Sequence, residues 1–143
     1  MHVVFGRKGD ESLYQDALSI REKVFVIEQN VPVEEEIDSF EEEATHFVLY
    51  DGNKPVGAGR FRLLEEGIGK IERICVLPDY RSKGAGRLIM EGIERFASEC
   101  GVKKTKLNAQ THAEAFYSKL GYETVSDVFM DAGIPHVTMV KKL

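Results

Sequence analysis

The segment Arg81-Ser82-Lys83-Gly84-Ala85-Gly86 is the feature that most restricts how this chain can fold. It follows an apolar run, Ile71 to Leu77, that Pro78 ends, and it precedes residues 88–100, whose apolar positions recur at helical spacing. The pattern predicts a strand, a glycine-containing turn and an amphipathic helix. Glycines at the start of a helix let unpaired backbone N–H groups approach an anion, and the helix dipole favours negative charge there. The turn is therefore predicted to bind a phosphate group.

Three basic side chains, those of Arg81, Lys83 and Arg87, add positive charge to the same turn. The spacing excludes two common phosphate motifs. A P-loop needs Lys and then Ser or Thr after its second glycine, whereas Gly86 is followed by Arg and Leu. A dinucleotide-binding fingerprint needs three glycines in an early βαβ unit, and here only Gly84 and Gly86 are in register.

The turn instead resembles the acyl-CoA-binding motif of the GNAT acetyltransferase superfamily, Arg/Gln-x-x-Gly-x-Gly/Ala. Leu107-Asn108-Ala109 and residues Ala115–Tyr122 resemble the second motif of that superfamily, a strand followed by a short tyrosine-bearing helix that ends at Gly-Phe/Tyr. The two motifs occur in the family's order, and the resemblance covers residues 46–143. It implies an N-acetyltransferase that takes the acetyl group from acetyl-CoA.

The length and composition are those of an ordinary globular domain. A chain of 143 residues, 43% hydrophobic and 30% charged, predicts a single domain over residues 1–143 with its own core. The net charge of −5 disfavours a general nucleic-acid binder, and no run of about 20 apolar residues predicts a membrane span. Cys75 and Cys100 on apolar faces and a start without an export signal favour a cytoplasmic protein. No His/Cys cluster has metal-ligand spacing, so no metal is expected.

Hydrophobic periodicity and turn residues predict an α/β chain in the order β-α-β-β-β-α-β-α-β-β, which is also the order that the GNAT fold implies. Strands are expected at 2–5, 46–50, 56–63, 68–77, up to 108, around 122–130 and at 136–140. Helices are expected from an N-cap at Asp10 to Phe25, from the phosphate turn to Gly101, and over the second motif, with 26–45 irregular. The resemblance implies a central mixed, mostly antiparallel sheet whose fourth and fifth strands splay apart, flanked by helices.

Acetyl transfer to an amine needs a bound thioester, a base for the ammonium group, donors for the oxyanion and an acid for the departing thiolate. By resemblance, backbone groups of Ile74, Cys75 and Val76 pair with the pantetheine arm, and Asn108 hydrogen-bonds to it. Tyr117 is the expected acid, the alternative being a tyrosine packed under the sheet. The expected cofactor-binding residues are Ile74, Cys75, Val76, Arg81, Ser82, Lys83, Gly84, Ala85, Gly86, Arg87, Asn108 and Tyr117.

Glu72 is the candidate base, acting directly or through a water, because it lies two residues before the expected oxyanion amide. The alternatives are a surface glutamate paired with Lys70 or Arg73, or solvent as the base. Cys75 next to a thioester could act as a nucleophile, but no histidine neighbours it in the sequence. Direct transfer within a ternary complex is therefore expected.

The acceptor site is expected between the segment after the first helix and the last hairpin, which cover it in GNAT folds. Arg21, Glu28 and His136 are the candidate substrate contacts, with ion pairing, capping or a strand-end role as the alternatives. Residues around Arg21 and His136 resemble a small bacterial branch of the superfamily. The acidic run 34–43 either attracts a polycationic acceptor or forms a solvated face.

The leading interpretation is an amine N-acetyltransferase with a small-molecule acceptor, because the acceptor loops are short. The alternatives are an acyl-CoA sensor without turnover and a protein-interaction or nucleic-acid module that uses the basic turn. A homodimer stays open, since no apolar stripe in the sequence requires one.

Overall fold

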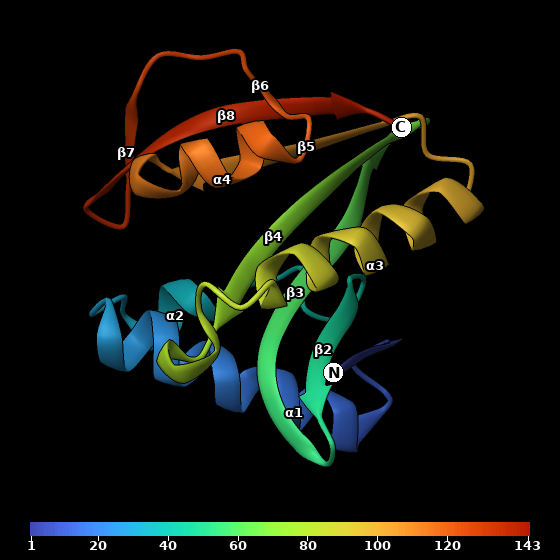
Figure 1. Cartoon of the computed structure of the whole chain (residues 1–143), viewed down its shortest axis with the longest axis vertical. Helices are drawn as coiled ribbons and strands as arrows, with labels where there is room; N and C mark the ends of the chain where they lie inside the picture. Colours follow the sequence, from blue (N-terminus) through green and yellow to red (C-terminus); the bar gives the residue numbers. More distant parts are fainter.

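The computed structural model describes residues 1–143, which form one twisted sheet with helices on both faces (Figure 1). The strands are β1 (His2–Gly6), β2 (Thr45–Asp51), β3 (Lys54–Glu65), β4 (Ile68–Val76), β5 (Lys104–Gln110), β6 (Glu123–Thr124), β7 (Phe129–Asp131) and β8 (Ile134–Lys142). The helices are α1 (Glu11–Arg21), continued by a π-helical segment (Glu22–Glu28), then α2 (Val33–Glu36), α3 (Ala85–Glu99) and α4 (Glu114–Lys119). None of these helices has the combination of length and apolar character needed to cross a membrane.

The sheet has the order β1-β2-β3-β4-β5-β8-β6, with β7 added to β8. Every neighbouring pair is antiparallel except β4 and β5, which confirms the predicted mixed, mostly antiparallel sheet. β4 and β5 pair over Ile68–Ile71 and Lys104–Leu107, and neither strand pairs with the other beyond those residues. The predicted splay is thus confirmed: the two strands diverge in a V toward their carboxyl ends (Figure 1), and this interruption of the strand pairing is called the gap below.

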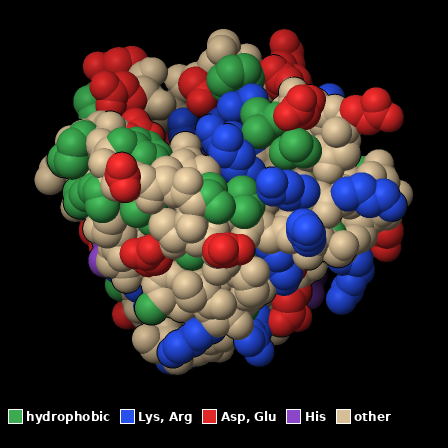
Figure 2. Space-filling model, turned by 90° about the horizontal axis from the view of Figure 1, so that it is seen from above, with side chains coloured by type: hydrophobic (Ala, Val, Ile, Leu, Met, Phe, Trp, Pro, Cys, Tyr) green, Lys and Arg blue, Asp and Glu red, His purple; other side chains and the backbone are tan.

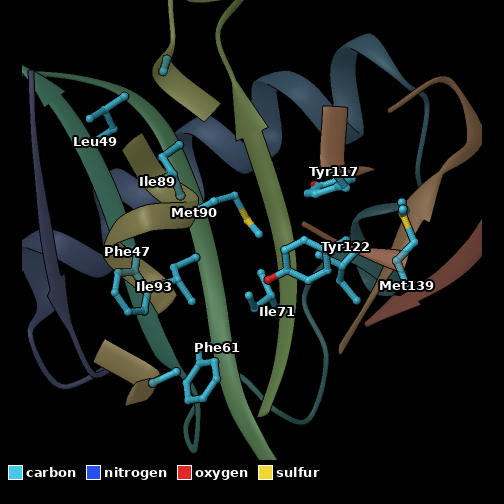
Figure 3. Close-up of a cluster of buried hydrophobic side chains, with 14 of the residues drawn as sticks. Phe47, Leu49, Phe61, Ile71, Ile89, Met90, Ile93, Tyr117, Tyr122 and Met139 are labelled. Atoms are coloured by element: carbon cyan, nitrogen blue, oxygen red, sulfur yellow. The ribbon is translucent and has the colours of Figure 1, made fainter. Parts of the chain in front are cut away.

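Two apolar clusters hold the helices against the sheet. On one face, α3 presents Ala85, Ile89, Ile93 and Ala97 at a spacing of four residues, and these pack with β2, β3 and β4 and with the tyrosines of the C-terminal part (Figure 3). On the other face, Leu13, Ala17 and Ile20 of α1 pack on Val48, Ala58 and Cys75. The two clusters fix β4 between the helix layers, so its free edge is rigidly placed.

The first helix differs from its prediction. The α-helix ends at Arg21 and continues as a π-helical segment to Glu28, with the Gln29 N–H donating to the Val24 carbonyl at 3.1 Å. Apolar periodicity alone does not separate the two helix types, because both keep one face buried. Asp10 occupies the N-cap position but its side chain makes no capping hydrogen bond. The region expected to be irregular contains the short α2.

The strand expected around 122–130 is divided into β6 and β7. Between them, the Ser126 hydroxyl accepts a hydrogen bond from the Thr138 N–H at 2.8 Å, and the Val125 N–H donates to the Thr138 carbonyl at 2.9 Å. The serine side chain takes the place of a backbone acceptor, so the ladder is interrupted there.

Candidate active site

The turn before α3 is a row of unpaired backbone donors. The Arg81 N–H donates to the Pro78 carbonyl at 3.2 Å, and the Leu88 N–H donates to the Gly84 carbonyl at 3.1 Å. The six N–H groups between them, from Ser82 to Arg87, donate to no group of the protein. Ser82 and Gly84 are left-handed, with φ of 62° and 79°, which turns successive N–H groups toward one side. This geometry suits a diphosphate group.

A close contact explains the glycine at position 86. A Cβ atom there would lie 2.9 Å from the ring of Phe116, so only glycine lets the first turn of α3 pack directly on α4. The same contact brings the turn close to the helix that carries Tyr117. The two sequence motifs therefore meet in space.

The basic side chains of the turn are partly engaged. Arg81 forms a two-point ion pair with Glu28, at 2.7 and 2.8 Å, and its Nε donates to the Val76 carbonyl at 3.0 Å. Glu28, a candidate substrate contact, thus lies against the turn before α3. The Lys83 ammonium lies 5.9 Å from the centre of the Tyr80 ring, and Arg87 is 3.9 Å from Glu91.

β4 contains a bulge where it leaves β5. Ala58 of β3 faces Cys75 and Arg60 faces Glu72, so two residues of β4, Arg73 and Ile74, oppose the single residue between them. Arg73 has a φ of 60°, which is unusual for a residue with a side chain. Beyond the bulge, β4 stays paired with β3 while its other edge, which includes the candidate residues Ile74 to Val76, has no strand partner.

Tyr117 of α4 is buried between Phe116 and Tyr122, with ring centroids 4.9 and 6.0 Å away. Figure 3 shows its side chain directed toward β4. Its hydroxyl has no hydrogen-bond partner in the protein, in contrast to that of Tyr122. Burial, and then the nearby Cys75, raise the pKa of Tyr117, so the phenol remains protonated at neutral pH. It is a free proton donor beside the gap.

Cys75 lacks the properties of a nucleophile. Its side chain is 5% exposed and packs with the apolar face of α1. Burial, followed by the charge of Glu36, raises the pKa of its thiol to about 12. The thiolate, which is the reactive form, is therefore scarce at neutral pH.

Glu72 is held by three cations. Its carboxylate lies 2.9 Å from Arg60, 2.8 Å from Arg62 and 3.5 Å from Lys70. Burial alone would raise the pKa of Glu72, but the charges of Arg60, Lys70 and Arg62 and the hydrogen bond from Arg62 lower it. Glu72 is thus paired with Lys70, which is one of the alternatives to its role as the base, and its lowered pKa makes it a weaker proton acceptor.

Arg21 lies inside the protein. Its side chain is 1% exposed and is bound by Glu36 at 3.3 Å and by Glu41 at 2.7 Å. Glu41 also binds Arg60, and Asp38 binds both Arg60 and Arg73. Glu36, Asp38 and Glu41 of the acidic run therefore form the anionic part of a buried ion network, whereas Glu34, Glu35, Glu42 and Glu43 of the same run are exposed. Arg21 has no surface open to a ligand in this arrangement.

Two residues at the mouth of the gap were not found from the sequence. The side chains of Gln29, after the π-helical segment, and Gln110, at the end of β5, bond to each other at 2.8 Å. His112 contacts the Gln110 side chain at 2.6 Å. Glutamines give no local signal of such a pairing, because the two positions are 81 residues apart.

Asn108 and His136 lie on the C-terminal side of the gap. Asn108 directly follows the last β5 residue paired with β4, and its Oδ1 accepts a hydrogen bond from the Thr138 hydroxyl at 2.8 Å. His136 faces Gln110 across β5 and β8. Its Nδ1 lies 2.7 Å from the Ile134 carbonyl, and its ring stacks on Phe129. No group of three or more His, Cys, Asp or Glu side chains is arranged to hold a metal ion.

Comparison with known proteins settles the family. Residues 10–143 match the family model described as an acetyltransferase (GNAT) domain. The chain belongs to the GNAT acetyltransferase family. Among GNAT relatives, it is 55% identical over 135 residues to the uncharacterized N-acetyltransferase YjcF of Bacillus subtilis, covering 94% of this chain and 95% of YjcF.

Solved structures agree on the GNAT fold. The chain superposes on a Lactobacillus plantarum protein assigned as an N-acetyltransferase with a TM-score of 0.92 and 24% identity, covering 99% of this chain and 97% of that one. It superposes on an acyl-CoA N-acyltransferase of Pseudomonas aeruginosa with a TM-score of 0.85 and 25% identity, covering 97% of each chain. The splayed strands and the donor row before α3 are thus parts of an acyl-CoA N-acyltransferase fold.

Proposed function

We propose that this protein transfers the acetyl group of acetyl-CoA directly to a primary amine of a small molecule, within a ternary complex. One observation carries the proposal: six consecutive free N–H groups, Ser82 to Arg87, stand beside the unpaired edge of β4. The donor row is suited to the diphosphate of CoA, with Lys83 and Arg87 adding charge. GNAT membership and the acyl-CoA N-acyltransferase of like fold support this choice of donor.

The pantetheine arm enters the gap as an added strand, and its amides pair with the free backbone groups of Ile74 to Val76. Asn108 faces it from β5. The amine nitrogen attacks the thioester carbon, and a backbone N–H of β4 donates to the oxyanion. The intermediate then collapses with cleavage of the C–S bond, and Tyr117 donates its proton to the departing sulfur, giving the thiol of CoA. The nitrogen loses its second proton as the amide forms, and this proton restores Tyr117 to the phenol form.

The ammonium group of the acceptor must first lose a proton. Glu72 has a lowered pKa and three cationic partners, so it is a weak proton acceptor. A water molecule at the mouth of the gap carries the proton to solvent. Cys75 stays protonated and is therefore a poor nucleophile, so the proposed mechanism has no acetyl-cysteine intermediate.

The acceptor enters on the side of Gln29, Gln110 and His136. The bond between Gln29 and Gln110 narrows this entrance, which favours a small molecule over a peptide. We retain His136 as a substrate contact in this proposal. Arg21 and Glu28 have structural roles near the site. Arg21 forms ion pairs with Glu36 and Glu41, and Glu28 forms an ion pair with Arg81.

The test is calorimetric titration with acetyl-CoA of the wild type, Gly84→Glu and Gly101→Glu. Both glycines have positive φ and open space around the position of a Cβ, so the two substitutions carry the same backbone strain. Only Gly84→Glu places a carboxylate in the donor row. We expect micromolar binding that is lost in Gly84→Glu and kept in Gly101→Glu.

Release of CoA is then measured with a panel of small primary amines. Release that depends on both substrates supports the transferase. Tight binding without release from any amine would make the protein an acyl-CoA sensor, and absence of binding to the wild type would refute the choice of donor.

A further inference from the structure

We propose that the acceptor carries an anionic group, a carboxylate or a phosphate, in addition to its amine, and that lysines on the open face of β4 and β5 bind this group. The inference rests on the proposed function, because it names the substrate class for the same gap. We define the basic face by the side chains Arg62, Lys70, Lys104, Lys106 and Lys142.

The strand register places these five residues on one face of the sheet. Lys70 of β4 faces Lys106 of β5 in the parallel pair, and Arg62 of β3 faces Lys70 from the other side. Lys104 faces Lys142 of β8. Alternate residues of a strand share a face, so Glu72 and Asn108 belong to this face as well. The basic face is therefore continuous with the site.

The part of the basic face on β5 and β8 is open, whereas Arg62 of β3, with a side chain only 12% exposed, packs on the ring of Phe40. α1 packs against β2, β3 and β4 and not against β5 or β8, whereas α3 and α4 pack on the opposite side of the sheet (Figure 1). Figure 2 looks down on the end of the molecule that carries β5 and β8, and Lys and Arg side chains gather there. Lys104, Lys106 and Lys142 take part in no ion pair.

The lysines of the basic face on β5 and β8 carry positive charges that no ion pair of the protein neutralises. The ion network around Glu72 joins five cations to four carboxylates, namely Arg21, Arg60, Arg62, Lys70 and Arg73 with Glu36, Asp38, Glu41 and Glu72. The three unpaired lysines add to this positive excess, although the whole chain has a net charge of −5. Carboxylates also border this region: Glu123 on β6, beyond Val140, Glu65 and Glu66 in the β3–β4 turn, and the exposed glutamates of the acidic run, Glu34, Glu35, Glu42 and Glu43.

The spacing fits a small bifunctional molecule. Lys106 precedes Asn108 by two residues, which is about 7 Å along a strand. The amine of the acceptor would lie beside Asn108, where the strands part, and its anionic group would lie beside Lys106. A small molecule can span the distance between these two positions. The buried carboxylates of the acidic run, Glu36, Asp38 and Glu41, give no competing cation site, because they are already paired.

The test compares amines that differ in charge alone. We would measure kcat/KM for 2-aminoethyl phosphate against ethanolamine, and for β-alanine against β-alanine amide, each with saturating acetyl-CoA. We expect the wild type to favour the anionic member of at least one pair by tenfold or more. The preference should weaken as salt is raised, and the pair that shows it distinguishes a phosphate from a carboxylate.

Lys106→Glu should reduce that preference at least tenfold. Arg7→Glu makes the same charge change at an exposed residue that has no ion-pair partner and lies far from the gap, and should leave the preference unchanged. Acetylation of both members at equal rates, or a preference for the neutral ones, would overturn the inference while the proposed function stands.

Binding is also followed without turnover. The CoA-loaded protein is titrated with 2-aminoethyl phosphate and with β-alanine, and the backbone amide signals of Lys70, Lys106 and Thr138 are monitored by NMR. Shifts in the wild type that Lys106→Glu abolishes support the anion site even if no amine is acetylated, in which case only the proposed function fails. Absence of shifts with both probes would overturn the inference.

Discussion

Glu28 and Arg81 join two segments that lie 53 residues apart in the chain, through oxygen–nitrogen contacts of 2.7 and 2.8 Å. Glu28 ends the π-helical segment, and Arg81 immediately precedes the donor row before α3. The hydrogen bond from Arg81, against a small opposing effect of burial, lowers the pKa of Glu28, so the pair stays ionised throughout the neutral range. The two sides of the site are therefore tied together by one ion pair.

Glu28→Gln should tighten the binding of acetyl-CoA about threefold, because it removes a negative charge beside the expected diphosphate and frees the Arg81 guanidinium. The effect is small because both partners are exposed. Calorimetry at low and high salt measures it, with Glu22→Gln as a control at an exposed glutamate without an ion pair on the same segment. Weaker binding would mean that the ion pair itself shapes the turn.

Two tyrosine variants should have different effects: Tyr117→Phe should slow catalysis, whereas Tyr122→Phe should lower the stability of the fold. The Tyr117 hydroxyl has no protein partner, so its removal should cost little stability but lower kcat at least tenfold with the acetyl-CoA affinity kept. The Tyr122 hydroxyl bonds to Thr105 at 2.9 Å and to Glu94 at 2.8 Å, so its removal should cost about 1–3 kcal/mol of unfolding free energy. Urea unfolding and steady-state kinetics decide, and equal kinetic losses in both variants would contradict the role of Tyr117 as the acid.

Arg73→Gly should be more stable than Arg73→Ala by about 1 kcal/mol, because the φ of 60° suits glycine and strains alanine. Both variants lose the contacts of the guanidinium with Glu36 and Asp38, so the difference between them isolates the backbone. Urea unfolding of the two proteins gives the value. If alanine proves as stable as glycine, the bulge relaxes to an extended form.

Asp38 should contribute an acid-sensitive part of the stability. Burial would raise the pKa of Asp38, but hydrogen bonds from Arg60 and the Phe40 N–H and the charges of Arg60 and Arg73 lower it to about 2. A carboxyl whose folded-state pKa is lowered stabilises the protein above its unfolded pKa of about 4, and this contribution is lost as the pH falls through about 2. Its full size is about 2 kcal/mol.

Asp38→Asn should therefore lower the unfolding free energy by about 2 kcal/mol at pH 7 and by much less near pH 2. Glu36, whose pKa burial raises against the attraction of Arg21 and Arg73, is present in both proteins and acts in the opposite sense. Urea midpoints between pH 2 and pH 7 provide the test, with the exposed Asp127→Asn as the control. A difference that does not change with pH would exclude the linkage.

The sequence was most informative where chemistry is local. The turn from Arg81 to Gly86 could be placed between a strand and a helix because glycine, proline and apolar spacing all act over a few residues. The positive φ of Gly84 follows from the same local rules. The splay of β4 and β5 came from the family resemblance, and no residue pattern alone would have placed it.

The long-range charges were not predictable in this way. The run 34–43 predicts an acidic surface, but Glu36 and Glu41 are buried and Asp38 is half-buried, because these three pair with arginines that include Arg60 and Arg73 on later strands. Arg60 gave one usable signal, a charged residue within the apolar strand from Val56 to Leu63. Gln29 and Gln110 gave none. Burial of an ion network depends on partners that only the tertiary fold brings together.

The short pairing between β4 and β5 has a mechanical consequence. Four residue pairs are the only ladder joining the N-terminal part of the sheet to the part formed by β5, β6, β7 and β8. Such a seam allows the C-terminal part to open as its own cooperative unit below the free energy of global unfolding. Amides of Ala109 and Val137 should then exchange with deuterium more readily than those of Phe47 and Val48, and acetyl-CoA should slow them selectively. Acetyl-CoA bound in the gap would supply hydrogen bonds between β4 and β5 where the backbone makes none, and would thereby couple the unfolding of the two parts of the sheet.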